Sequence, residues 1–275
     1  MDHYENFPVA SWLCPPRLRP AIAAIYRFAR AADDIADEGD APADQRLEDL
    51  SAFRHDLNAI ATGARESGRW PHVFRPLRAV LHDFALPSAL LDQLLDAFEQ
   101  DVRFTASARR YESDAELLDY CKRSANPVGR LLLHLYGMQD ELSLTQSDRI
   151  CSALQLINFW QDLSVDLARE RWYPSVQAMQ QHAVQATDLQ RKSESANAGR
   201  MVAGYVLQAR DMMTAGAPLA RRIPGRAGWE LRLVVQGGLR ILDKIEAMGY
   251  QSWRRRPTLG PADLPLLLWR AWRMR

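Results

Sequence analysis

The sequence predicts an all-α protein, and three observations lead to this prediction. Apolar residues recur at intervals of three and four along most of the 275-residue chain, the spacing that gives a helix one apolar face. Alternating apolar and polar runs, which would indicate half-buried strands, are hard to find. Proline or glycine marks the ends of several periodic segments. We therefore expect about eight to ten helices that form a bundle around a central cavity.

Boundary signals delimit the predicted helices in the first part of the chain. The first helix follows Pro15-Pro16, and the second lies between Pro42 and Gly63. Pro87 separates the third helix from the fourth. Proline is accepted in the first turn of a helix, and glycine commonly ends one. These four helices are predicted over residues 17–37, 44–61, 71–84 and 88–103.

Capping residues delimit the helices that follow. Ser113-Asp-Ala-Glu116 is a capping box, in which the two outer side chains satisfy free backbone amides at a helix start. Asn126-Pro127 and Thr145-Gln-Ser-Asp148 are two further helix starts, and Gly137 and Gly249 each follow the end of a helix. These helices are predicted over residues 113–121, 126–136, 145–169, 188–213 and 229–248.

Composition restricts the class of protein. The chain is 47% hydrophobic and 25% charged with a net charge of +1, which excludes a disordered chain and argues against a nucleic-acid partner. The three cysteines show no Cys-x-x-Cys spacing, so a reducing cytoplasm fits best. The first ten residues do not form a signal peptide, and no run of 18 apolar residues predicts a membrane span. We expect one domain over residues 1–275, with 257–275 as a peripheral segment.

Candidate chemistry begins with Asp-x-x-x-Asp pairs, which place two carboxylates one helical turn apart. Four such pairs occur: Asp33/Asp37, Asp40/Asp44, Asp92/Asp96 and Asp162/Asp166. Chance alone predicts roughly two, so the spacing is a weak signal. Asp40/Asp44 straddle a proline, and Asp92/Asp96 share a helix face with other charged and polar residues. We expect these two pairs to be structural.

The other two pairs extend helix faces that otherwise look buried. Asp33/Asp37 continue a stripe that includes Tyr26, and Asp162/Asp166 continue one that includes Asn158. A buried carboxylate needs a partner or a metal, with salt bridges at the helix ends as the alternative. Carboxylates with an amide, without His or Cys, favour Mg²⁺ or Mn²⁺ over zinc. Because Mg²⁺ usually bridges to substrate phosphates, two such helices in an apolar bundle suggest an isoprenoid diphosphate substrate.

Three segments together resemble the squalene/phytoene synthase family. Arg30-Ala-Ala-Asp33-Asp-Ile-Ala-Asp37 resembles its first aspartate-rich motif, and Gln155-Leu-Ile-Asn158-Phe-Trp-Gln161-Asp162-Leu-Ser-Val-Asp166 resembles its second. Tyr120-Cys-Lys-Arg-Ser-Ala-Asn-Pro-Val128-Gly129 is similar to the segment between them, and the match extends over about residues 3–256. The resemblance implies an isoprenoid-synthase-type fold and a Mg²⁺-dependent enzyme.

Two further segments, at 3–11 and 237–246, resemble the branch of this family that converts presqualene diphosphate to hydroxysqualene in bacterial hopanoid pathways. That branch ionises the diphosphate, rearranges the carbocation and captures water without a nicotinamide. Other enzymes of the squalene and hopanoid pathway are then the implied partners. Two alternatives stay open: a head-to-head prenyl synthase that makes presqualene diphosphate, squalene or phytoene, and a non-catalytic assembly factor of the same fold.

The resemblance also implies residue roles. The implied metal ligands are Asp33, Asp37, Asn158, Asp162 and Asp166. Diphosphate contacts are implied for Arg30, Arg255 and Arg256, with a solvated turn as the alternative for 254–256. Tyr26, Tyr120 and Gln155 are the implied catalytic residues. Phe7, Phe28 and Phe159 are candidate wall residues, because aromatic faces stabilise a carbocation, and core packing is their alternative.

Three positions depart from the condensing members of the family. Gln161 stands where many have an arginine, Glu5 where many have a basic residue, and Gly238 where a tyrosine is usual. Two phosphate donors and one hydroxyl are therefore missing. This loss puts a two-substrate condensation in doubt and fits a branch that handles one diphosphate.

The C-terminal stretch 264–275 combines leucines and tryptophans with Arg270, Arg273 and Arg275. A short basic, aromatic segment of this kind can lie on a membrane surface. Peripheral membrane association is therefore one expectation for this segment, and packing back onto the bundle is the alternative.

Overall fold

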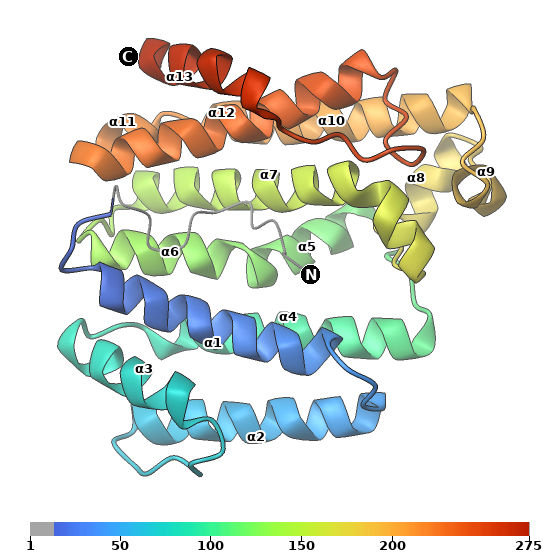
Figure 1. Cartoon of the computed structure of the whole chain (residues 1–275). Coiled ribbons are helices and arrows are strands. Elements are labelled where there is room, and N and C mark those ends of the chain that lie inside the picture. Colours follow the sequence, from blue (N-terminus) through green and yellow to red (C-terminus); the bar gives the residue numbers. More distant parts are fainter. Residues whose placement is uncertain (1–13, 275) are drawn as a thin grey trace. The chain divides into compact units, whose positions relative to one another are not determined.

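A computed structural model describes residues 14–274 of the chain (Figure 1). Every regular element within these residues is a helix, which confirms the predicted all-α class. The chain divides into two compact units, and neither is continuous in sequence. The first contains the described residues up to Arg109 with Pro127–Asp140, and the second contains Arg110–Asn126 with the residues from Glu141 onward. The expectation of one domain over 1–275 stays a prediction.

The first unit is built on the N-terminal helices. Its elements are α1 (Arg19–Asp37), α2 (Ala43–Ala61), α3 (Pro71–Asp83), α4 (Ser88–Ser107) and most of α6 (Asn126–Leu135). The first helix packs against α2, α3 and α4. Three fully buried rings join these helices, since Phe53 lies 5.0 Å from Phe28 and 4.7 Å from Phe74 between ring centroids. Their burial supplies much of the apolar contact that holds this unit together.

The second unit is organised around α7 (Glu141–Asp166), a 26-residue helix that packs against α5, α10, α11 and α12. The other helices of this unit are α5 (Asp114–Ser124), α8 (Val176–Gln181), α9 (Ala186–Gln190), α10 (Ala196–Gly216), α11 (Leu219–Arg222), α12 (Gly225–Ala247) and α13 (Leu264–Arg273). Two 3₁₀ turns, Leu167–Arg169 and Pro261–Asp263, precede a loop and α13 respectively. Because neighbours cover it on several sides, α7 is buried around most of its circumference.

The helix predicted over 188–213 is the main error in the sequence-based assignment. Two helices replace it, α9 and α10, with a break after Gln190. Lys192 takes a left-handed backbone conformation, which an α-helix does not accept. The hydroxyl of Ser195 then accepts a hydrogen bond from the Ala198 amide and starts α10. Residues 190–195 are all polar, so the apolar spacing is interrupted at this break, and that interruption could have indicated it.

Other boundaries match their signals closely. Ser113 caps α5 by accepting from the amide of Glu116, as the capping box predicts. The second half of the box differs, because the carboxylate of Glu116 accepts from the Glu112 amide at 2.7 Å instead of from that of Ser113. Gly137 and Gly249 both have positive φ at the helix ends that they were expected to form. Across residues 14–274, no helix is both long enough and apolar enough to cross a membrane.

Candidate active site

A polar stripe runs along α7, which is otherwise buried. Between residues 150 and 164, the side chains of only Gln155, Asn158 and Asp162 are partly exposed, and all others are buried. Spacings of three and four place these side chains on one face of the helix, and Asp166 continues that face at the helix end. The structure therefore brings together four of the residues predicted from the second aspartate-rich motif.

Arg256 approaches this stripe from the segment that follows α12. Its guanidinium donates to both carboxylate oxygens of Asp162, through Nε and through Nη2. The neighbouring Gln161 donates from Nε2 to the carbonyl of Pro257 at 2.9 Å. Two adjacent residues of α7 thus hold two adjacent residues of the later segment. This contact joins positions that lie 94 and 96 residues apart in the chain.

The two acids of the stripe differ in electrostatic environment. Burial and, to a lesser extent, the nearby negative charge of Asp162 raise the pKa of Asp166 to about 7. The charges of Arg171, Arg169 and Arg256 oppose this rise without cancelling it. Asp166 is therefore a carboxyl group short of positive charge. A divalent cation beside it would supply that charge, so the donor set and its electrostatics suit Mg²⁺.

The three consecutive arginines before Pro257 have separate roles. Arg254 pairs with the exposed Glu194 at 2.9 Å, which is a surface ion pair. Arg255 is exposed, as expected if this segment is a solvated turn. Arg256 alone contacts an acid of the second motif. The proposed diphosphate contact is thus best supported at Arg256.

An aromatic cluster adjoins the stripe in the second unit. Phe159 stacks on Tyr173 with ring centroids 3.7 Å apart, and Tyr120 lies 6.3 Å from Phe159. Tyr111 lies 5.9 Å from Tyr120 and 6.4 Å from Tyr173. Tyr120 and Phe159 were predicted from the sequence, whereas Tyr173 and Tyr111 were missed. Both lie outside the motifs, and aromatic residues without a periodic context carry no signal of their own.

The acids of the first motif lie at the end of α1 in the other unit. Arg30 contacts Asp33 at 3.2 Å, Asp34 at 2.7 Å and Glu38 at 3.7 Å. The side chains of Asp33 and Asp34 are about half exposed, and Asp37 is exposed. The salt bridges expected as the alternative for these acids are therefore present around Arg30. A phosphate contact for Arg30 and metal binding by Asp33 and Asp37 stay predictions.

The remaining candidate residues of the predicted cavity differ in their burial. Phe28 is fully buried against Phe53 and Phe74, and this placement favours core packing over a role in a cavity wall. Tyr26 is partly exposed on α1. Phe7, together with the departure at Glu5, lies outside the described residues. The cavity and catalytic roles of the other candidates stay predictions.

The two pairs expected to be structural behave as such. Arg54 on α2 contacts Asp92 and also Asp96 at 2.8 Å and Glu99 at 3.0 Å on α4, so one cation neutralises a group of acids. Asp40 and Asp44 are exposed around the start of α2. Within residues 14–274, no three His, Cys, Asp or Glu side chains gather closely enough to hold a metal by themselves. Facing acidic helices stay a prediction, because α1 and α7 belong to different units.

The departure at Gly238 has a packing explanation. A Cβ atom at this position of α12 would lie 3.0 Å from Met213, 3.1 Å from Ile157 and 3.3 Å from Leu154. The side chains of α7 and α10 thus occupy the space that a larger residue would need. A tyrosine, which would bring a hydroxyl, would require these side chains to move.

Comparisons with known proteins agree with the motifs. Residues 1–263 match the sequence model of the squalene/phytoene synthase family. A hydroxysqualene synthase of Sinorhizobium fredii is 32% identical over 97% of this chain and 87% of its own length. A presqualene diphosphate synthase of Rhodopseudomonas palustris is 28% identical over 94% of this chain and 90% of its own length.

Solved structures show the same fold. The squalene synthase HpnC of Alicyclobacillus acidocaldarius superposes with a TM-score of 0.80 at 32% identity, covering 90% of each chain. A dehydrosqualene synthase solved with a ligand gives a TM-score of 0.84 at 20% identity, covering 98% of this chain and 92% of its own. The motifs, the fold and the sequence match agree, and the chain belongs to the squalene/phytoene synthase family of isoprenoid synthases.

Proposed function

We propose that this enzyme converts presqualene diphosphate and water to hydroxysqualene and diphosphate. The observation that carries the proposal is the 32% identity, over nearly the whole chain, to a relative named hydroxysqualene synthase. The polar stripe on α7, with its two carboxylates and Arg256, supplies the chemistry that a diphosphate leaving group needs. In this reaction the bond from carbon to the diphosphate oxygen breaks, and the electron pair leaves with oxygen. A water oxygen then bonds to the rearranged cation and releases one proton.

We further propose that Mg²⁺ serves as the cofactor, with Mn²⁺ as a substitute. Asp162, Asp166 and Asn158 on α7 would hold it, and the metal-binding role implied for Asp33 and Asp37 on α1 stays a prediction. When bound, the metal would stabilise the negative charge of the departing diphosphate. Mg²⁺ commonly uses one or two carboxylates and takes its other ligands from water and substrate phosphates, so the pair on α7 is sufficient for one ion.

Arg256 supplies a second source of positive charge. Its planar guanidinium already donates to both oxygens of Asp162, a geometry that also matches two phosphate oxygens. With Asp162 engaged as a metal ligand, the guanidinium of Arg256 would be available for the diphosphate. Lysine would keep the charge of Arg256 but lose the fork of donors.

The two departures that the structure describes support a single diphosphate substrate. The amide of Gln161 is buried and already used by the Pro257 carbonyl, so this position offers no phosphate donor. Gly238 offers no hydroxyl, and a ring at this position would require the surrounding side chains to move. A condensing enzyme must hold two diphosphates, and its second site would need donors that these positions lack.

The walls of the proposed cavity would protect the cation. The stack of Phe159 on Tyr173, with Tyr120 beside it, presents aromatic rings next to the polar stripe. Aromatic faces attract a carbocation without reacting with it, because their quadrupole is negative above the ring. Water would then be the nucleophile that ends the reaction, and no hydride donor would be needed.

Product analysis tests this proposal. Purified protein with Mg²⁺ and presqualene diphosphate should form an alcohol at the same rate with and without NADPH. Reaction in ¹⁸O-labelled water should place the label in that alcohol. Squalene that appears only with NADPH, or rapid consumption of farnesyl diphosphate alone, would refute the proposal and favour a condensing or reductive synthase. An absence of any turnover, with no binding of an unreactive diphosphate analogue in the presence of Mg²⁺, would favour an assembly factor.

A further inference from the structure

The outer face of α13 is apolar where a soluble helix is usually polar. Leu264, Leu268, Trp269 and Trp272 recur at helical spacing, and each is between 47% and 55% exposed. Pro265 and Arg273 complete this face, which we call the α13 outer face. The inner side holds the buried Ala271 and the partly buried Leu266, Leu267 and Arg270. Large apolar side chains clustered on one exposed face indicate an interaction surface.

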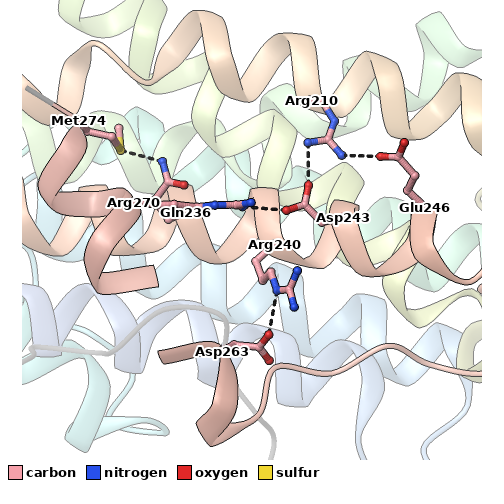
Figure 2. A network of polar contacts seen from close by, with 8 residues as sticks. All are labelled: Arg210, Gln236, Arg240, Asp243, Glu246, Asp263, Arg270 and Met274. Atoms are coloured by element: carbon pink, nitrogen blue, oxygen red, sulfur yellow. Dashed lines mark hydrogen bonds and ion pairs between the residues drawn. The ribbon is translucent and has the colours of Figure 1, made fainter. Parts of the chain in front are cut away.

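Polar contacts, rather than a large apolar core, hold α13 on α12 (Figure 2). Arg270 donates to Asp243 at 2.7 Å, and Arg210 on α10 donates to the other oxygen of the same carboxylate at 2.9 Å. Gln236 contacts the sulfur of Met274 at the far end. The basic residue on the inner side, Arg270, is thus paired with an acid of the same unit. Leu264, Leu268, Trp269 and Trp272 are left on the outside.

Polar contacts also hold the start of α13. Asp263, just before the helix, accepts from Arg240 at 2.8 Å and from Lys244 at 2.6 Å. It also accepts from the Gly260 amide at 2.8 Å, which closes the preceding turn. Polar contacts therefore hold both the start and the middle of α13, and they fix the side of the helix that faces outward. Figure 2 shows Arg240 and Asp263 paired at one end of this network.

The charge of the segment limits the identity of the partner. Residues 264–275 contain three arginines and no acidic residue. Arg273 lies on the outer face, with its guanidinium 4.8 Å from the centre of the Trp269 ring. Tryptophan and arginine beside leucines are typical of helices that lie in the interface between lipid headgroups and acyl chains. Ten residues span only about 15 Å, so this helix can lie on a bilayer but cannot cross one.

We propose that the α13 outer face docks on an anionic lipid bilayer, with the helix parallel to the membrane plane. Leu264, Leu268, Trp269 and Trp272 would enter the boundary between headgroups and acyl chains. Arg273 would contact lipid phosphates. This inference does not depend on which reaction the enzyme catalyses.

Vesicle sedimentation tests the proposal with the full-length protein. The probes are sucrose-loaded vesicles of phosphatidylcholine alone and of phosphatidylcholine with 30% phosphatidylglycerol. The variant Trp269→Ser/Trp272→Ser should bind the anionic vesicles at least tenfold more weakly than the wild type. The variant Arg273→Gln should lose most of the preference for anionic over neutral vesicles. Circular dichroism and thermal melting establish that each variant is folded.

Leu207→Ser provides a matched control, because Leu207 on α10 is also a large exposed apolar residue, at 59%. This variant should bind vesicles as the wild type does. The proposal is overturned if the double tryptophan variant binds vesicles normally, or if the Leu207 variant loses as much binding. It is also overturned if the wild type binds no vesicles but forms a dimer that the tryptophan substitutions dissociate, because the face would then bind a second copy of the chain.

Discussion

The raised pKa of Asp166 leads to a stability prediction that distinguishes it from its neighbour Asp162. Ionising Asp166 in the folded protein costs free energy because the carboxylate is largely buried and lies near a like charge. In the unfolded chain the same carboxyl has a pKa of about 4. Since the folded-state pKa is the higher, the protonated group favours folding. This contribution is complete below pH 4 and is lost as the pH rises through 7.

The variant Asp166→Asn removes the penalty and keeps the shape of the side chain. With about 1.4 kcal/mol per pKa unit, the raised pKa of Asp166 costs the wild type about 4 kcal/mol of stability at pH 8 and about 1.5 kcal/mol at pH 5. In EDTA the variant should therefore be more stable than the wild type, by an amount that grows with pH. The difference at pH 8 corresponds to a rise in melting temperature on the order of 10 °C for a protein of this size.

Asp162→Asn is the control for this measurement. Asp162 already has a cationic partner in Arg256, so the substitution removes a partly exposed ion pair. It should change the stability by no more than about 1 kcal/mol at pH 8, because the loss of a partly exposed ion pair and the relief of the repulsion between Asp162 and Asp166 act in opposite directions. Thermal melts of both variants and the wild type at pH 5 and pH 8, all in EDTA, make the comparison. The reasoning is refuted if Asp166→Asn is no more stable than the wild type at pH 8, or if its gain is the same at both pH values.

Three further predictions concern other parts of the chain. Asp33→Ala should abolish turnover of presqualene diphosphate but shift the unfolding free energy by less than about 1 kcal/mol, and near-normal turnover would contradict this. Gly228→Ala should destabilise by about 2 kcal/mol in urea unfolding, because its Cβ would lie 2.3 Å from a backbone oxygen, whereas Gly237→Ala, with only a 3.8 Å contact, should not. Asp263→Asn should cost about 3 kcal/mol at pH 7, because a hydrogen bond from Lys244 and another from the Gly260 amide hold the pKa of Asp263 well below its usual range. This stabilisation is present above pH 4 and is lost as the pH falls through the depressed pKa, so a loss that does not shrink in acid would contradict it.

Local signals predicted the helix boundaries well because they act through neighbouring atoms. Ser113 caps α5 through an amide three residues away, and Gly137 and Gly249 end helices through their own backbone conformation. The break before Ser195 was missed although the polar run over residues 190–195 interrupts the apolar spacing. Part of what supports that break is distant in sequence: the indole of Trp253 donates to the carbonyl of Ser193, 60 residues earlier. Single-sequence periodicity contains no information about such contacts.

In the candidate site too, the sequence predicted features that depend on neighbouring residues but not contacts between distant ones. The stripe from Gln155 to Asp166 follows from spacing along one helix, and the sequence alone predicted it. The pairing of Asp162 with Arg256 did not follow, because three consecutive arginines look alike until the fold places one of them on an acid. Phe28 illustrates the reverse case. Its position beside a motif suggested a functional wall, and its neighbours Phe53 and Phe74 bury it in the core.

The supply of cations explains why one Asp-x-x-x-Asp pair is structural and another is a candidate metal site. Asp92 and Asp96 have identical spacing to Asp162 and Asp166, and both contact the single guanidinium of Arg54. Arg256 contacts Asp162, and Asp166 keeps a raised pKa despite the arginines nearby. A helix gains no stability from burying a carboxylate whose charge is incompletely neutralised. If Mg²⁺ binds Asp166 as proposed, adding Mg²⁺ should raise the melting temperature of the wild type at pH 8 more than that of Asp166→Asn.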